Sequence, residues 1–94
     1  MNVGHAVCIC RAAKHLTLEE LSERSNLSKS YLSMIENGKR NPSMKTVKSI
    51  SDALNIPLPV FIMLSADIKE MKGIDKDTII QLRKSVLDAI GYET

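Results

Sequence analysis

The sequence predicts an all-α fold, on the spacing of its apolar residues and on the polar signals that separate them. Apolar side chains recur every three or four positions through most of the 94 residues, as they do on the buried face of a helix. The alternation of apolar and polar residues that a strand requires is not sustained anywhere in the sequence. The length suits one domain with a modest core that needs neither disulfides nor metal.

Capping residues mark the first two expected helices. The first helix covers roughly residues 3–14, and His15 follows at the position where a helix often ends on a left-handed residue. Thr17 and Glu20 have the spacing of a capping box, in which each side chain hydrogen-bonds the backbone amide of the other residue. The second helix therefore begins at this box, and we expect it to end near Ser25.

A short turn leads to the third expected helix. Asn26 tolerates a positive φ in this turn, and Ser28 can cap a helix that opens at Lys29. Asn37 and Gly38 end that helix, because glycine adopts the left-handed conformation without strain. Two helices joined by so short a turn form a helix-turn-helix arrangement.

Serine, proline and glycine delimit the remaining expected helices. Ser43 starts a fourth helix. Its apolar stripe consists of Met44, Val47, Ile50 and Leu54. Pro59 fits the first turn of a fifth helix that is expected to run to about residue 72. Asp75 caps a last helix that is expected to end at Gly91.

Positive charge is concentrated in about one quarter of the chain. The formal net charge is only +2, but residues 24–48 carry +5, because six cations there accompany a single anion, Glu36. The cations are Arg24, Lys29, Lys39, Arg40, Lys45 and Lys48. A local cationic patch on a nearly neutral protein favours a polyanionic partner; chance clustering on a solvated face is the alternative.

The cysteines and the apolar runs argue against several classes of function. Cys8 and Cys10 have no second cysteine pair and only His5 and His15 nearby, which makes a poor zinc site. We expect reduced thiols, with a redox or metal role as the alternative. The longest apolar run, residues 60–64, is too short to span a bilayer, and no secretory signal is visible. A cytoplasmic protein without membrane contact, metal, cofactor or evident small-molecule ligand is therefore expected.

The third expected helix combines a buried side with a small polar side. Leu32 and Ile35 take the inward positions. Lysine can donate to guanine, serine can donate or accept at several bases, and methionine can contact a thymine methyl group. The candidate base-reading residues in a major groove are Lys29, Ser30, Ser33 and Met34. The alternative is that this helix is simply an exposed amphipathic helix of a bundle.

Residues that flank this helix suit phosphate contacts. Thr17 and Ser28 stand at helix N-termini, whose free amides favour anions. A polar and cationic loop follows the helix and can lie along a nucleic-acid backbone. Its candidate phosphate-binding residues are Asn37, Lys39, Arg40 and Asn41.

Residues 3–62 resemble the phage repressor and Cro family of helix-turn-helix domains, also called XRE-type. The resemblance rests chiefly on LTLEEL at residues 16–21 and IENGKRNPS at residues 35–43. It implies a compact lambda-repressor-like domain of about five helices, with the third helix in the major groove of operator DNA and usually a dimeric protein. A C-terminal helix follows this domain.

The resemblance also implies roles for individual residues. It marks Lys29, Ser30 and Met34 as base readers, in agreement with the residue-by-residue argument. It marks Asn37, Lys39 and Arg40 as phosphate contacts. It further implies an ion pair between Arg11 and Glu36 that ties the first helix to the end of the third, which is a structural role and not a catalytic one.

The chain departs from the family at several positions. Leu18 stands where the family commonly has glutamine, whose amide contacts a phosphate, and Asn26 stands where glycine is usual. The first helix lacks the basic residues that the family often carries. An exposed Ile9 or Leu18 is therefore a candidate contact with another protein, and scattered surface apolar residues are the alternative.

The last third of the chain lies beyond the resemblance. We expect a DNA-binding domain over residues 1–65 and a helical extension over residues 66–94. The apolar arc of the last helix is broad enough for a dimer interface, and packing within the chain is the alternative. The candidate interface residues are Ile79, Leu82, Val86 and Ile90. A dimer would hold two recognition helices about 34 Å apart, which matches a palindromic site.

These features predict a sequence-specific transcription regulator that binds a palindromic operator in double-stranded DNA as a homodimer. A prophage repressor, a restriction-modification controller and an antitoxin-like autoregulator all remain open. The alternative from another class is a protein-interaction module on the same fold without DNA binding. An enzyme is not expected, because no nucleophile, base and orienting group fall at motif spacing.

Overall fold

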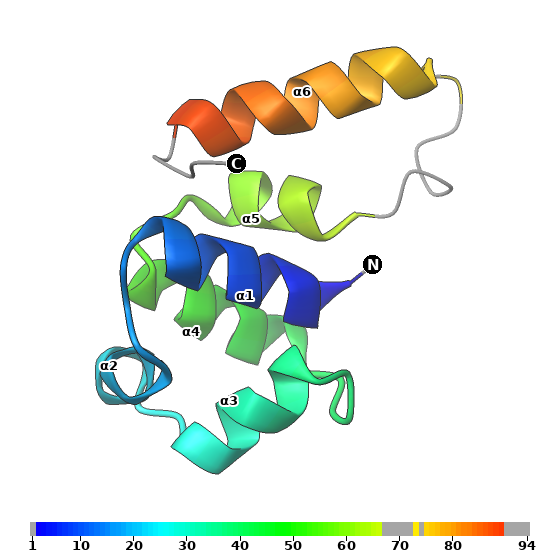
Figure 1. The fold of residues 1–94 in the computed structure, drawn as a ribbon. Helices are drawn as coiled ribbons and strands as arrows, with labels where there is room; N and C mark the ends of the chain where they lie inside the picture. Colours follow the sequence, from blue (N-terminus) through cyan, green and yellow to red (C-terminus); the bar gives the residue numbers. More distant parts are fainter. Residues whose placement is uncertain (1, 67–72, 74, 90–94) are drawn as a thin grey trace.

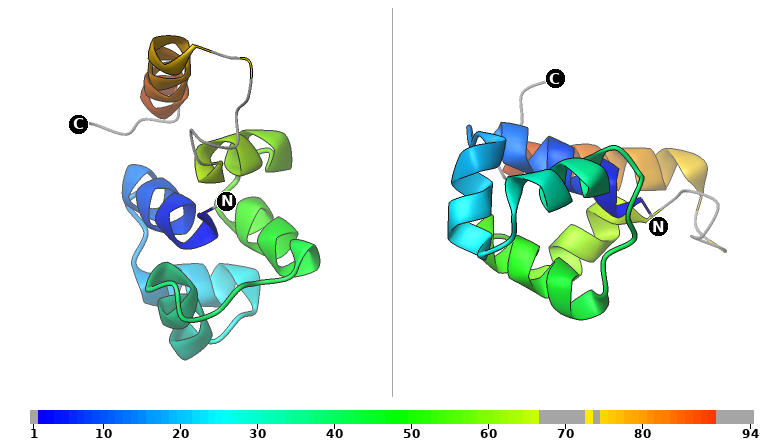
Figure 2. Two further views of the ribbon diagram at one scale, coloured as in Figure 1. Left: turned by 90° about the vertical axis from the view of Figure 1, so that its right-hand side faces the viewer. Right: turned by 90° about the horizontal axis from the view of Figure 1, so that it is seen from below.

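The structure, a computed structural model, describes residues 2–66, 73 and 75–89. In these ranges it contains six α-helices and no strand, so the all-α prediction is confirmed (Figure 1). The helices are α1 (Val3–Ala13), α2 (Leu18–Ser25), α3 (Lys29–Glu36), α4 (Met44–Ala53), α5 (Leu58–Ser65) and α6 (Lys76–Ala89). Helices α1 to α5 surround one core, and α6 packs on the outer side of α5 (Figures 1 and 2).

Each of the first five helices contributes a large side chain to this core. These side chains are Val7, Leu21, Leu32, Ile50 and Phe61, and all are fully buried. Burial of one such side chain stabilises the fold by about 1.5 to 3 kcal/mol relative to exposure. The core therefore fixes which side of every helix faces inward and which side remains on the surface.

Besides Asn26 at the end of α2, left-handed residues end three further helices. His15, Gly38 and Asn55 have φ values of 55°, 74° and 58° after α1, α3 and α4. At each end the following amide reaches back into the last turn, as the N–H of Lys39 does to the carbonyl oxygen of Met34 at 2.8 Å. This is the Schellman pattern. The predicted helix ends at His15 and Gly38 are confirmed.

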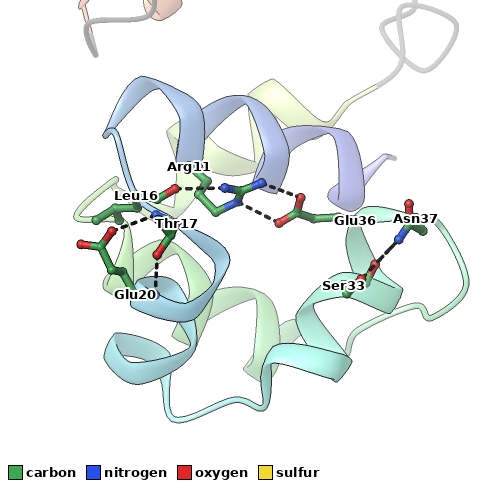
Figure 3. A network of polar contacts seen from close by, with 7 residues as sticks. All are labelled: Arg11, Leu16, Thr17, Glu20, Ser33, Glu36 and Asn37. Carbon is green, nitrogen blue, oxygen red and sulfur yellow. Dashed lines mark hydrogen bonds and ion pairs between the residues drawn. The ribbon is translucent and has the colours of Figure 1, made fainter.

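Side-chain caps begin the second, third and fourth helices. Both hydrogen bonds of the predicted capping box are present: Thr17 Oγ1 accepts from the Glu20 amide, and Glu20 Oε1 accepts from the Thr17 amide, each at 3.1 Å (Figure 3). The hydroxyls of Ser28 and Ser43 accept from the third amide of α3 and α4 at 3.1 and 3.3 Å. The left-handed Asn26, with φ of 59°, makes the turn between α2 and α3.

The apolar stripe predicted for α4 includes one residue too many. Val47, Ile50 and Leu54 are buried, but the side chain of Met44 is 53% exposed. Met44 is the first residue of α4, and helical side chains lean toward the helix N-terminus. It therefore leans over the preceding loop and away from the core.

Helix α5 ends at Ser65, and the prediction of a helix to about residue 72 is wrong. Ala66 has extended backbone, with ψ of 139°. The N–H of Asn2 donates to the Ser65 carbonyl at 2.5 Å, and the guanidinium of Arg83 donates to the Ala66 carbonyl. Contacts from the N-terminus and from α6 therefore engage backbone carbonyls at the end of α5.

Helix α6 spans Lys76–Ala89, so the expected end at Gly91 lies outside the described residues. The same is true of Ile90 and of the side chains of Ile79, Leu82 and Val86. Their role in a dimer and the domain boundary at residue 65 therefore remain predictions.

No single helix in the described ranges is long and apolar enough to cross a membrane. Helices α4 and α5 taken together have the length and apolar composition of a membrane span, but the chain bends by 111° at the break between them. The apolar side chains Ile50 and Phe61 of these two helices are buried in the core.

Candidate nucleic-acid interface

Helices α2 and α3 pack against each other around a turn that is held by side chains. The Ser22 hydroxyl donates to the Leu27 carbonyl at 2.5 Å, and the Leu27 amide donates to Ser25 Oγ at 3.3 Å. Behind the turn, Leu32 and Ile35 of α3 are buried in the core. The opposite side of α3 is thereby turned to solvent on a rigid support.

The predicted base-reading residues share this outer side of α3. Lys29 and Ser30 are exposed, and Met34 is 37% exposed. Ser33 is half-buried, and the side-chain Nδ2 of Asn37 donates to the Ser33 carbonyl at 2.9 Å and lies 3.4 Å from Ser33 Oγ (Figure 3). Lys29, Ser33 and Asn37 follow one another at intervals of four residues, so they form one row along the helix.

The N-terminus of α3 is electrostatically open to an anion. Its first turn contains no acidic residue, and Lys29 is its first residue. Ser28 caps it by accepting from the Tyr31 amide, which leaves the Ser28 hydroxyl hydrogen available. The other amides of the first turn have no intrahelical partner and favour a phosphate.

The N-terminus of α2 is different, because it carries Glu19 and Glu20 in its first turn. The Glu20 carboxylate accepts from the Thr17 amide, and this hydrogen bond holds the pKa of Glu20 below its usual value. A carboxylate therefore already lies where a phosphate would approach Thr17. Of the two predicted helix-terminal phosphate sites, the one at Ser28 is the more favourable, because no carboxylate lies beside it in the first turn.

The exposed apolar contact expected at Ile9 or Leu18 is not found, because both side chains are half-buried. Leu18 packs against the core cluster. It thus fills space at the start of α2 where a polar side chain would reach outward.

The predicted phosphate-binding loop lies directly after α3. Asn37, Lys39, Arg40 and Asn41 are all exposed. The guanidinium carbon of Arg40 lies 5.6 Å from the centroid of the Tyr31 ring, which places the cation over an aromatic side chain of α3. Tyr31 was not among the residues predicted for the site. An aromatic residue in the helix beside a basic loop was the available signal.

The Arg11 and Glu36 side chains form the ion pair that the family resemblance implies (Figure 3). Arg11 Nε donates to Glu36 Oε2 at 3.0 Å, and Nη2 donates to Oε1 at 3.1 Å. Arg11 Nη1 also donates to the Leu16 carbonyl at 3.0 Å. The hydrogen bond with Glu36 raises the pKa of Arg11, which therefore stays charged. One guanidinium thus connects α1, the start of α2 and the end of α3.

Gly4 allows α1 to approach the same end of α3 closely. A Cβ atom at Gly4 would lie 2.2 Å from the carbonyl oxygen of Ile35 and 3.1 Å from that of Glu36. No side chain fits there without displacement of the α3 backbone. Sequence reasoning missed this role, although a glycine inside a helix is a signal of close approach.

The described residues contain no group of three or more histidine, cysteine or acidic side chains that could hold a metal ion. Cys8 is exposed and Cys10 is buried, and both are free thiols. Burial raises the pKa of Cys10 to about 11, so this thiol stays protonated at neutral pH.

A family profile described as helix-turn-helix matches residues 9–61. The chain belongs to the helix-turn-helix family. Among helix-turn-helix proteins it is similar to the immunity repressor protein of Bacillus phage phi105, with 37% identity over 70 residues. The match covers 74% of this chain and 49% of the repressor, so the chain spans about half the length of that relative.

Two solved helix-turn-helix structures are similar to this fold. The clp gene regulator ClgR from C. glutamicum is 34% identical, with a TM-score of 0.63, over 66% of this chain and 80% of ClgR. The restriction-modification controller protein C.Esp1396I is 26% identical, with a TM-score of 0.63, over 85% of this chain and 87% of the controller.

Proposed function

We propose that the protein is a sequence-specific DNA-binding regulator of transcription that acts in the cytoplasm and has no catalytic activity. In this function α3 enters the major groove of double-stranded DNA. The observation that carries the proposal is the outer side of α3, where Lys29, Ser30 and Met34 are exposed on a helix with an open N-terminus. The names of the relatives, an immunity repressor, a gene regulator and a restriction-modification controller, support the same function.

Within this proposal the base contacts and the phosphate contacts have separate sources. Lys29, Ser30, Ser33 and Met34 read base edges, because short and flexible side chains near the start of a recognition helix reach them. The Ser28 terminus and the cationic loop at Lys39 and Arg40 hold phosphates. Thr17 contributes less, since Glu20 lies beside it.

We also propose that two copies bind one palindromic operator, with residues 1–65 on the DNA and residues 66–94 joining the copies. Two half-sites about 34 Å apart would then be read in successive major grooves. The exposed cations on each copy neutralise phosphates, so affinity falls steeply with salt.

A second candidate function, a protein-interaction module without DNA binding, is favoured by one observation. The N-terminus of α2 contains the inward-packed Leu18 at the position where the family commonly has a glutamine that contacts a phosphate. Leucine cannot donate a hydrogen bond to a phosphate there.

Selection of bound duplexes from a random DNA pool separates the two candidates. The proposal predicts enrichment of a palindrome with half-site centres about one helical turn apart. No enrichment, together with no binding to any duplex at about 50 mM salt, would support the interaction module.

A further inference from the structure

We infer that Tyr31 is a positioning residue for DNA binding, whose ring holds the guanidinium of Arg40 ready to donate to a phosphate. The inference rests on the proposed function, because it concerns how a loop cation meets DNA. It assigns to an aromatic side chain of α3 a role in the phosphate contact of the next loop.

The ring of Tyr31 is a fixed surface. The Tyr31 amide donates to Ser28 Oγ at 3.1 Å, which holds the residue in the first turn of α3. Its side chain is half-buried and packs against the core cluster. The ring therefore has little freedom of its own, and the Arg40 guanidinium lies over it with 5.6 Å between the guanidinium carbon and the ring centroid.

Arg40, the other partner of the contact, follows a turn of fixed geometry. Gly38 has φ of 74°, and the Lys39 amide donates to the Met34 carbonyl at 2.8 Å, so the chain leaves α3 along one path. Arg40 follows immediately and is exposed. The cation–π contact with Tyr31 is a second restraint, which keeps the side chain of Arg40 near α3.

A guanidinium in a cation–π contact remains able to bind phosphate. Its N–H groups lie in the plane of the group and point outward from its edge, so those directed away from the ring stay free to donate. A phosphate accepts two parallel hydrogen bonds from that edge. The ring thus restricts the side chain before DNA arrives, and less conformational freedom is lost on binding.

The test is a double-mutant cycle of Tyr31→Leu and Arg40→Ala in the full chain. The probe is a mixed-sequence duplex of about 30 base pairs in about 50 mM salt, because the contact is to backbone and not to bases. We expect Tyr31→Leu to weaken binding about 2- to 5-fold in the Arg40 chain and to have no effect in the Arg40→Ala chain. Tyr31→Phe keeps the ring and should bind like the unmodified chain.

Lys39 supplies the matched control, since it neighbours Arg40 and no aromatic contact to it is found in the described part of the chain. Tyr31→Leu and Lys39→Ala should be additive in the logarithm of Kd. Thermal unfolding of each variant checks that it is folded at the assay temperature, and Tyr31→Met replaces Tyr31→Leu if the latter is not. NMR of the free protein should show an upfield ring-current shift of the Arg40 side-chain protons that Tyr31→Leu abolishes.

Each unfavourable result has a distinct meaning. Additive effects of Tyr31→Leu and Arg40→Ala would overturn the inference and leave the proposed function intact. Equal losses in Tyr31→Phe and Tyr31→Leu would assign the effect to the hydroxyl and overturn it as well. Failure of the unmodified chain to bind any duplex would contradict the proposed function and, with it, this inference.

Discussion

Substitution of Glu36 by alanine removes one partner of the ion pair that connects α1 to α3. The variant leaves Arg11 bound to the Leu16 carbonyl but takes away both acceptors at 3.0 and 3.1 Å. Breaking a fully buried ion pair from one side costs about 3 to 5 kcal/mol. The Arg11 and Glu36 side chains are 24% and 12% exposed, so solvent compensates part of the loss. We therefore expect destabilisation of about 2 to 3 kcal/mol.

The assay is thermal unfolding followed by far-ultraviolet circular dichroism at neutral pH. For a domain of this size the expected loss lowers Tm by roughly 10 to 20 °C. The matched control is Lys48→Ala, which also breaks an ion pair, with Asp52 at 3.1 Å, but between side chains that are 58% and 63% exposed. Such a pair contributes only about 0.3 to 0.5 kcal/mol, so the control should change Tm by no more than a few degrees.

The two variants also differ in their response to salt. High salt screens the exposed Lys48 pair and should erase the effect of its removal. It should leave most of the Glu36→Ala effect in place, because the broken contact is largely shielded from solvent. A Glu36→Ala variant that unfolds at the same temperature as Lys48→Ala would refute the conclusion that this ion pair holds α3 in place.

Three further predictions concern the packing, the charge and the thiols. Gly4→Ala should destabilise the fold by more than about 2 kcal/mol in urea unfolding, because the new Cβ meets the Ile35 carbonyl at 2.2 Å; equal or higher stability, as helix propensity alone predicts, would contradict the close approach. Glu20→Gln keeps a capping acceptor but removes an anion from the N-terminus of α2. Fluorescence anisotropy should show tighter binding to mixed-sequence DNA at about 50 mM salt and no gain at high salt; an unchanged low-salt affinity would show that DNA does not approach this terminus. At about pH 8 a thiol reagent should modify the exposed Cys8 readily, and the buried Cys10, with a pKa of about 11, only after unfolding. The control variant Cys8→Ser should abolish the reaction of the native protein. Equal reaction rates of the two thiols in the native protein would disprove the burial of Cys10.

Helix boundaries were predictable where local chemistry decides them. The capping box of Thr17 and Glu20 and the left-handed residues His15 and Gly38 act within a few residues of the chain, so the sequence alone contains the relevant interactions. The end of α5 was not predictable in this way. The carbonyl of Ser65 is engaged by an amide from the N-terminus, more than sixty residues away in the chain.

The candidate site also combines features that the sequence predicts with features that it does not. The exposed side of α3 follows from the burial of Leu32 and Ile35, which helical periodicity indicates. The cation–π contact of Arg40 with Tyr31 depends on the path of a loop, and no periodic pattern encodes that path. The glycine inside α1 is a signal of close approach, but its partner, the end of α3, is identified only when α1 and α3 are placed together.

The measurement that tests the division between base contacts and phosphate contacts most directly is selection from a random DNA pool with Lys29→Ala and, in parallel, with Lys39→Ala. We expect Lys29→Ala to change the base preference at specific positions of the recovered site. Lys39→Ala should recover the unmodified site with weaker binding to every sequence and a salt slope reduced by about 1. A changed base preference in Lys39→Ala, with the unmodified preference in Lys29→Ala, would contradict the assignment of α3 as the helix that reads DNA.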